Sequence, residues 1–268
     1  MRSLRLFAAV IAALVVAACG EKDAAQHISA PTAGSAVKFF NFGVNDPAVN
    51  FYANDQKISA VSSATCSSSV NGTTKDSTCL TTGIETTKGT GYGANASTAG
   101  VYYSVTPGSY TLSGRIPATT NAISNTPATL ENGKFYSYYL SGIYDTTSKT
   151  VEGFVVEDPL PDTSSTAAYV RFVNAISNSQ PMTLYLTDAK GVEAHLGSDV
   201  AYKGASTFAA ISPGAYNLSA RPFGATTSVA TATGVSFSAG RVYTVTAYGD
   251  VNATSGANKP TLDNTLNR

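Results

Sequence analysis

Cys66 and Cys79 are the residues beyond the N-terminal segment whose type and spacing predict a covalent bond. The two cysteines enclose Asn71-Gly72, their midpoint falls just after Gly72, and Asn-Gly is a strong signal for a two-residue hairpin turn. The two thiols would face each other across such a hairpin, and an even pair in an oxidising compartment is typical of a disulfide. Closing a loop of this size contributes about 3 kcal/mol in the chain-entropy model. A metal or redox pair is disfavoured, because no His lies nearby and the spacing is not Cys-x-x-Cys.

Acid–base catalysis has few candidate residues in this chain, which contains two histidines. His195 lies in an alternating stretch, residues 192–196, and we expect it on a solvent-facing strand rather than in a triad. His27 lies in a polar segment with little to hold it in place. The motifs Gly-x-Ser-x-Gly and His-Glu-x-x-His do not occur, and residues 89–93 lack the Lys and helix of a phosphate loop. We predict no catalytic residues, no cofactor and no enzymatic activity.

The carboxylates are scattered along the chain, and their positions favour turns over a metal centre or a glycosidase pair. Asp46, Asp188 and Asp250 fall in expected turns, where Asp is common for conformational reasons. A second group surrounds the expected linker and consists of Glu157, Asp158 and Asp162. Calcium at such a junction is an open alternative, because hard oxygen ligands concentrate there. We predict turn formation and no metal site.

Tyrosine is the abundant aromatic residue, with 15 copies against 11 Phe and no Trp. Exposed Tyr rings can stack on a sugar, and the candidate ligand-facing residues are Tyr102, Tyr103, Tyr139 and Tyr144. The absence of Trp weakens this interpretation, and alternating Tyr normally packs against cross-strand neighbours. Carbohydrate binding is therefore the second hypothesis.

The N-terminus carries an export signal. Two arginines precede an apolar run from Leu6 to Ala18, which is too short for a spanning helix of about 20 residues and fits a secretory signal. Val16-Ala17-Ala18-Cys19-Gly20 resembles a bacterial lipobox. The resemblance implies cleavage after Ala18 and acylation of Cys19, with palmitate as a typical chain, and Gly20 after the Cys implies the outer membrane. An ordinary signal peptide with an incidental Cys is the alternative.

The charge balance excludes several classes of protein. The chain has 17 basic and 17 acidic residues among 268, and charged residues make up 13% against about 25% in an average soluble domain. Loss of a signal with two arginines leaves 15 basic against 17 acidic residues. A basic nucleic-acid binder and an acidic disordered tail are both excluded.

The chain is an internal duplication. Four pairs of segments match in order: Val37-Lys38-Phe39-Phe40-Asn41 with Val170-Arg171-Phe172-Val173-Asn174, residues 46–51 with 180–185, Pro107-Gly108-Ser109-Tyr110 with Pro213-Gly214-Ala215-Tyr216, and Gly133-Lys134-Phe135-Tyr136 with Gly240-Arg241-Val242-Tyr243. The second match aligns Asp46 with Gln180 and Phe51 with Tyr185. The first copy carries extra residues between Phe51 and Pro107.

The periodicity within each copy is that of strands. Val37 and Phe39 alternate with Lys38, as Val170 and Phe172 do with Arg171, which predicts half-buried strands with the basic residue outward. Short strands separated by turn residues predict an all-β fold of two tandem antiparallel β-sandwiches, immunoglobulin-like or transthyretin-like, with about seven strands each. The expected boundaries are signal peptide 1–18, flexible tether 19–35, first sandwich 36–158 with an insertion near 60–100, linker 159–167 and second sandwich 168–268.

These motifs carry a family resemblance. An opening Val-Lys/Arg-Phe-x-Asn, a central Pro-Gly-x-Tyr turn and a later Gly-Lys/Arg-x-Tyr strand resemble the domain-of-unknown-function family 4397 over nearly the whole mature chain. The resemblance implies small β-sandwiches, often in tandem, in bacterial surface lipoproteins and secreted proteins. It implies no catalytic residues. The insertion with Cys66 and Cys79 departs from the family pattern.

Together these features predict a non-enzymatic, structural or adhesive envelope protein anchored by lipid at the outer membrane. The expected partners are the membrane, through the N-terminal lipid, and an envelope protein or glycan, with no nucleic acid. The insertion of the first copy is the expected binding element, because loops on rigid sandwiches commonly carry binding.

Overall fold

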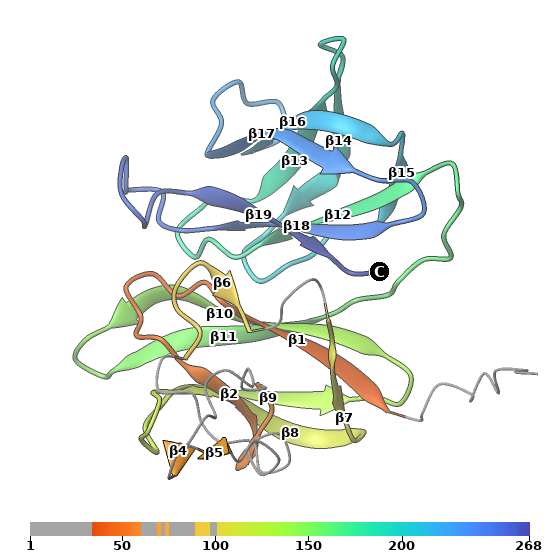
Figure 1. Cartoon of the computed structure of the whole chain (residues 1–268). Helices are drawn as coiled ribbons and strands as arrows, with labels where there is room; N and C mark the ends of the chain where they lie inside the picture. The colour runs from red at the N-terminus through yellow and green to blue at the C-terminus, as the bar shows by residue number, and fades with distance from the viewer. Residues whose placement is uncertain (1–33, 60–68, 71–72, 75–88, 97–100) are drawn as a thin grey trace, which may run out of the picture. The chain divides into compact units, whose positions relative to one another are not determined.

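The computed structural model describes residues 34–59, 69–70, 73–74, 89–96 and 101–268 (Figure 1). These residues form strands, turns and irregular connections, with no helix among them. Residues Ala33–Arg268 form one compact unit. The expected all-β fold is confirmed.

Within the part of the chain that the structure describes, no apolar helix has the length needed to cross a membrane.

The first copy contains eleven of the described strands. They are β1 (Ser35–Asn41), β2 (Asn50–Ala53), β3 (Gln56–Lys57), β4 (Ser69–Val70), β5 (Thr73–Thr74), β6 (Ala94–Asn95), β7 (Tyr103–Val105), β8 (Gly108–Arg115), β9 (Ala122–Leu130), β10 (Phe135–Asp145) and β11 (Thr150–Glu157). One sheet has the order β11-β10-β1-β6, with β7 also paired to β1, and the other has the order β3-β2-β8-β9. Side chains from both sheets share one buried cluster, which includes Phe39, Phe51, Leu112 and Tyr138.

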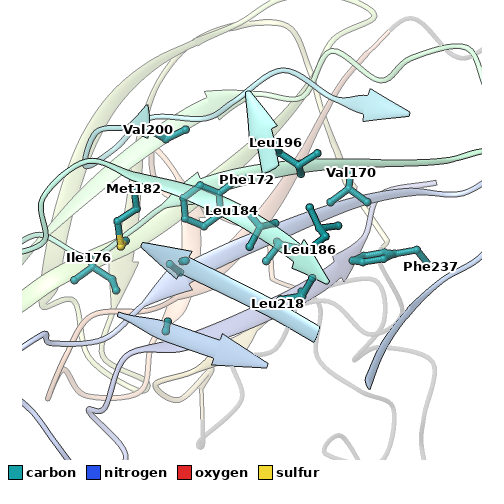
Figure 2. Close-up of a cluster of buried hydrophobic side chains, with 14 of the residues drawn as sticks. Val170, Phe172, Ile176, Met182, Leu184, Leu186, Leu196, Val200, Leu218 and Phe237 are labelled. Atoms are coloured by element: carbon teal, nitrogen blue, oxygen red, sulfur yellow. The ribbon is translucent and has the colours of Figure 1, made fainter. Parts of the chain in front are cut away.

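The second copy repeats this arrangement with fewer strands. They are β12 (Ala168–Asn174), β13 (Met182–Thr187), β14 (Glu193–Val200), β15 (Ala209–Ile211), β16 (Gly214–Arg221), β17 (Ala230–Phe237), β18 (Val242–Tyr248) and β19 (Thr261–Leu266). The sheets have the orders β15-β12-β18-β19 and β14-β13-β16-β17. Figure 2 shows the cluster between them, where Phe172 lies among Leu184, Leu186 and other apolar side chains.

One strand pair in each copy departs from the expected antiparallel pairing. β1 runs parallel to β10, and β12 runs parallel to β18, whereas the other sheet pairings are antiparallel in the described strands. Parallel neighbours need a long crossover connection, and here the intervening strands of the second sheet supply it. The sandwiches are therefore mixed, with the first strand of each copy in the middle of its sheet.

The strand registers also correct the alignment of the two copies. Phe51 pairs with Gly114 in the first copy, and Leu184 pairs with Ala220 in the second. Phe51 therefore corresponds to Leu184 rather than to Tyr185, and both side chains are completely buried.

The turns before β2 and β13 support the same corrected alignment. The Asp46 amide donates to the Gly43 carbonyl at 3.2 Å, and the Ser179 amide donates to the Ile176 carbonyl at 3.3 Å. Asp46 thus corresponds to Ser179, not to Gln180.

The Asn71-Gly72 turn signal is consistent with the strands that flank it. β4 and β5 pair antiparallel, with Val70 opposite Thr73. Cys66, Cys79 and Cys19 lie outside the described residues, so the disulfide and the lipid anchor remain predictions.

Candidate functional site

The basic residues that alternate with the core of β1 and β12 are buried, contrary to expectation. Lys38 and Arg171 are each 1% exposed. The outer faces of these two strands belong to a third apolar cluster that draws on both copies, including Phe40 and Tyr139 from the first and Val173 from the second. We refer to this contact between the copies as the inter-repeat interface. Alternation along one strand indicated which face packs in the sandwich core. It did not indicate that the other face packs against the second copy.

Arg171 forms a buried ion pair across the inter-repeat interface. Its guanidinium contacts the Asp158 carboxylate, and both side chains are at most 1% exposed. The guanidinium also donates to the Glu157 carbonyl at 2.8 Å and to the Thr244 hydroxyl at 3.0 Å. Asp158 in turn accepts from the Ser137 hydroxyl at 2.7 Å. These hydrogen bonds meet the requirement that a buried charge be paired and its remaining polar atoms satisfied.

Lys38 is buried, and no carboxylate of the described residues contacts it directly. Its ammonium donates to the Leu266 carbonyl and lies 4.3 Å from the centre of the Tyr102 ring. Burial lowers the pKa of Lys38 to about 8, an effect that the charge of Asp158 opposes and that of Arg171 reinforces.

The two halves of the inter-repeat interface repeat each other. Lys38 of the first copy reaches the carbonyl of Leu266 in the second, and Arg171 of the second copy reaches the carbonyl of Glu157 in the first. Glu157 and Leu266 are equivalent, because Glu157 pairs with Tyr136 and Leu266 pairs with the equivalent Tyr243.

The aromatic side chains next to the two cations also occupy equivalent positions in the two copies. Lys38 lies over the ring of Tyr102, and Arg171 lies 4.8 Å from the ring centre of Phe208, which precedes the equivalent strand. The two copies therefore use the same face to bind each other, as the subunits of a two-fold dimer do.

The four tyrosines predicted to face a ligand are buried to different degrees. Tyr139 is completely buried and stacks between Phe40 and Phe154, so its prediction as a ligand-facing residue is wrong. The reason is that its strand face, which one copy alone would expose, is covered by the second copy.

Tyr102, Tyr103 and Tyr144 are partly exposed, but their hydroxyls or rings already have partners. The Tyr102 hydroxyl donates to Asp158 and accepts from the Asn267 amide, each at 2.7 Å. The Tyr103 hydroxyl donates to the Ala96 carbonyl at 2.7 Å. Tyr144 packs against the core of the first copy. These contacts favour structural roles.

His195 lies on the exposed face of β14. Its Nδ1 is 3.0 Å from the Gly197 carbonyl oxygen, and no Ser or carboxylate of the described residues hydrogen-bonds to its ring. The ring centre is 5.2 Å from that of Phe223 and 5.9 Å from that of Tyr185. His195 therefore lies on an exposed strand face, as the sequence predicted.

Phe223 marks an exposed patch that the sequence analysis missed. The side chain is 60% exposed, and Phe223 lines a shallow cavity of about 390 Å³ with His195 and Asp199. The Asp199 carboxylate accepts the Phe223 amide at 2.9 Å and so holds the loop. Arg221 lies 3.7 Å from the Tyr185 ring centre beside them. We define the Phe223 patch as the exposed residues His195, Asp199 and Phe223 together with Arg221 and the buried Tyr185, which lie beside them. An apolar residue in the turn Arg-Pro-Phe-Gly was the available signal.

Among the described residues there is no group of three or more His, Cys, Asp or Glu side chains close enough to hold a metal ion. Asp158, considered for calcium at the linker, is instead committed to Arg171. Two of the turn aspartates act as expected, because Asp188 accepts the amides of Lys190 and Val192, and Asp250 accepts that of Asn252.

Fold and interface together define a tandem β-sandwich protein whose two repeats bind each other through equivalent faces. Residues 35–185 and 168–266 match the model of the family described as domain of unknown function (DUF4397), and the chain belongs to this family. No curated protein matches the chain. The resemblance inferred from the repeated motifs is confirmed.

Proposed function

We propose that the protein is a non-enzymatic binding protein of the bacterial cell envelope, anchored through lipid on Cys19, that holds a partner protein at the Phe223 patch. The observation that carries this proposal is the 60% exposure of Phe223, the aromatic residue among the exposed large hydrophobic residues of the described part of the chain. Aromatic side chains are frequent anchors at protein interfaces.

The surroundings of Phe223 support a protein partner. The Arg221 guanidinium stacks on the Tyr185 ring and contacts the Glu193 carboxylate at 2.6 Å. Aromatic residues and Arg are enriched at protein interfaces, with charged groups at the rim. The rigid strands beneath the patch limit the conformational entropy that binding would remove.

The surroundings of His195 support a non-enzymatic role. A general base needs an orienting partner and a nucleophile within hydrogen-bond reach. His195 instead interacts with the Gly197 carbonyl and with two aromatic rings.

A glycan is the second candidate ligand, now at the Phe223 patch rather than at the predicted tyrosines. The Phe223 ring stands beside His195, and the cavity between them also has the polar side chains of Ser198 and Asp199 in its wall. An aromatic ring flanked by hydrogen-bonding groups is the arrangement that sugar stacking needs. A glycan array that gives no signal with the purified protein would exclude this candidate.

The partner-binding proposal is tested by substituting Phe223→Ser and measuring cross-linking of the protein to envelope proteins in intact cells. We expect the specific cross-linked product to decrease at least tenfold. Val101→Ser is the matched control, because Val101 is 57% exposed on the first copy. Equal loss in both variants, or none in either, contradicts the proposal.

The insertion predicted to bind is tested separately by deleting residues 62–87, which leaves β6 and its pairing with β1 in place. Loss of cross-linking on this deletion, with Phe223→Ser unaffected, would assign binding to the insertion. We expect the deletion to leave cross-linking unchanged and Phe223→Ser to reduce it.

The anchor is tested by Cys19→Ser, which removes the acylated thiol. We expect the protein to leave the membrane fraction and the detergent phase. Unchanged partitioning would contradict the lipid anchor and would leave the partner-binding proposal intact.

A further inference from the structure

Asp46 differs from the other turn aspartates in where its carboxylate lies. The carboxylates of Asp188 and Asp250 point to backbone amides of their own turns. Asp46 is about nine-tenths buried, and neither of its carboxyl oxygens accepts a hydrogen bond from the described residues. A buried carboxylate without partners is strongly unfavourable, so burial raises the pKa of Asp46 to about 8, and a bound cation would stabilise the ionised form in place of the proton.

Asn41 presents a second unpartnered oxygen at the same place. It is completely buried, and its Nδ2 donates to the carbonyls of Thr90 at 2.9 Å and Pro47 at 3.4 Å. Its Oδ1 is left without a donor among residues that the structure describes. Asn41 and Asp46 are adjacent, because Nδ2 of Asn41 reaches the carbonyl of Pro47, the residue after Asp46. A weak contact with the Asn41 side chain also offsets part of the rise that burial causes in the pKa of Asp46.

Tyr92 adds a phenol oxygen that is also buried and without a partner within the described ranges. Burial, together with the nearby Tyr248 and Asp46, raises the pKa of the Tyr92 hydroxyl. Tyr92 lies beside Asn41 in the fold, because the amide of the next residue, Gly93, donates to the Asn41 carbonyl at 2.8 Å.

Gly43 makes room for the inward position of Asp46. A Cβ atom at residue 43 would lie 2.4 Å from Oδ2 of Asp46 and 2.9 Å from a methyl carbon of Val151. Such distances do not occur between real atoms, so any larger residue would displace the carboxylate. The second copy has Ile176 at the equivalent position.

The second copy satisfies the same asparagine without a carboxylate. Asn174 corresponds to Asn41, and its Oδ1 accepts the Ile176 amide at 3.0 Å. Its Nδ2 donates to the Ser179 hydroxyl and the Val200 carbonyl, each at 3.1 Å. Only the first copy gathers oxygen acceptors without donors at this position of the described fold.

We propose that Asn41, Asp46 and Tyr92 form a cation site that binds Ca²⁺. Calcium takes carboxylate, amide carbonyl and other hard oxygen ligands in flexible geometry, whereas Mg²⁺ requires near-ideal octahedral geometry and retains water. One carboxylate gives a weak site, with a dissociation constant of about 10⁻⁴–10⁻³ M, as in extracellular modules. The cation satisfies all three kinds of unpartnered oxygen at once.

The test is thermal unfolding of the purified full chain after treatment with EDTA, followed by addition of CaCl₂, MgCl₂ or NaCl at equal ionic strength. We expect Ca²⁺ to raise the midpoint by about 3–6 °C for each tenfold increase above the dissociation constant. Asp46→Ser, which installs the residue of the second copy, should abolish the response. Asp188→Ser is the matched control and should retain it.

Terbium luminescence gives a readout that does not depend on stability. Tb³⁺ replaces Ca²⁺ at oxygen sites, and excitation of tyrosine should sensitise it through Tyr92. We expect emission that Ca²⁺ displaces and that Asp46→Ser and Tyr92→Phe reduce at least fivefold. Equal emission from Asp46→Ser, or a thermal response to Mg²⁺ or Na⁺ without one to Ca²⁺, overturns the proposal.

Discussion

The two repeats solve the same packing problem with different side chains, and the differences separate structural positions from specialised ones. At the inter-repeat interface, Arg171 of the second copy has a carboxylate partner in Asp158, whereas Lys38 of the first copy has a carbonyl and an aromatic ring. The position equivalent to Asp158 carries Asn267.

The asymmetry has an electrostatic reason. Arg provides a planar fork that satisfies several acceptors, which suits a buried carboxylate, whereas Lys loses its charge more readily on burial. A second aspartate at the position of Asn267 would add a buried negative charge beside Asp158. The amide instead accepts from Thr244 and donates to Tyr102, and so links both halves without a charge.

The largest expected effect comes from removing the arginine of this pair. Arg171→Met leaves the Asp158 carboxylate buried without its counter-charge, and we expect a loss of about 3–5 kcal/mol of unfolding free energy. Lys38→Met removes a buried cation without orphaning a carboxylate, and at pH 7 we expect no loss of unfolding free energy. Urea unfolding of both variants checks this. Equal losses would show that the two halves contribute equally.

The next effect concerns pH and the lysine alone. Because the pKa of Lys38 is lowered to about 8 in the folded protein, from 10.5 in the unfolded chain, the unfolded state binds more protons between these values. Stability should therefore rise by up to about 3 kcal/mol from pH 8 to pH 10.5.

Lys38→Met isolates this contribution. The charged groups that act on Lys38 are Asp158, Arg171 and Asp263, and all three remain in the variant. The difference between the wild-type and variant stability curves should slope upward over this range. A flat difference curve would mean that Lys38 titrates as it does in water.

The smallest effect compares the paired positions 46 and 179. Ser179→Ala removes hydrogen bonds to Asn174 and Ile176, and we expect it to cost about 1 kcal/mol. Asp46→Ala, measured in EDTA, removes two unpartnered oxygens and should leave stability unchanged or raise it by about 1 kcal/mol. Differential scanning calorimetry of both variants checks whether Ser179→Ala alone is destabilised. Equal losses of stability in the two variants would show that the two turns contribute alike.

Much of the fold was predictable because strand periodicity and repeats are local signals. The alternation of Val37 and Phe39, and its repetition at Val170, predicted the core faces of both sandwiches correctly. The parallel pairing of β1 with β10 was not predictable, because alternation reports which side chains are buried and not which strand lies beside them.

The candidate site was much less predictable. Tyr139 was expected to face a ligand, because nothing in a strand pattern reports that a second sheet covers the outer face. The Phe223 patch and the Asp46 position both depend on loops whose neighbours are distant in sequence. His195 was placed correctly because the outer face of β14 is exposed, so alternation along the strand gave the right result there.

The sequence by itself determined the duplication, the strand character of each repeat and the family, because all three are carried by short local patterns that recur along the chain. The sequence also predicts a lipobox at Cys19 and a disulfide between Cys66 and Cys79, and both remain predictions. The tertiary structure decided that the repeats bind each other face to face, that Lys38 and Arg171 are buried, and that Asp46 lacks the partner that Ser179 has. These features arise from contacts between residues far apart in the chain, and no local pattern specifies the environment on the far side of a strand.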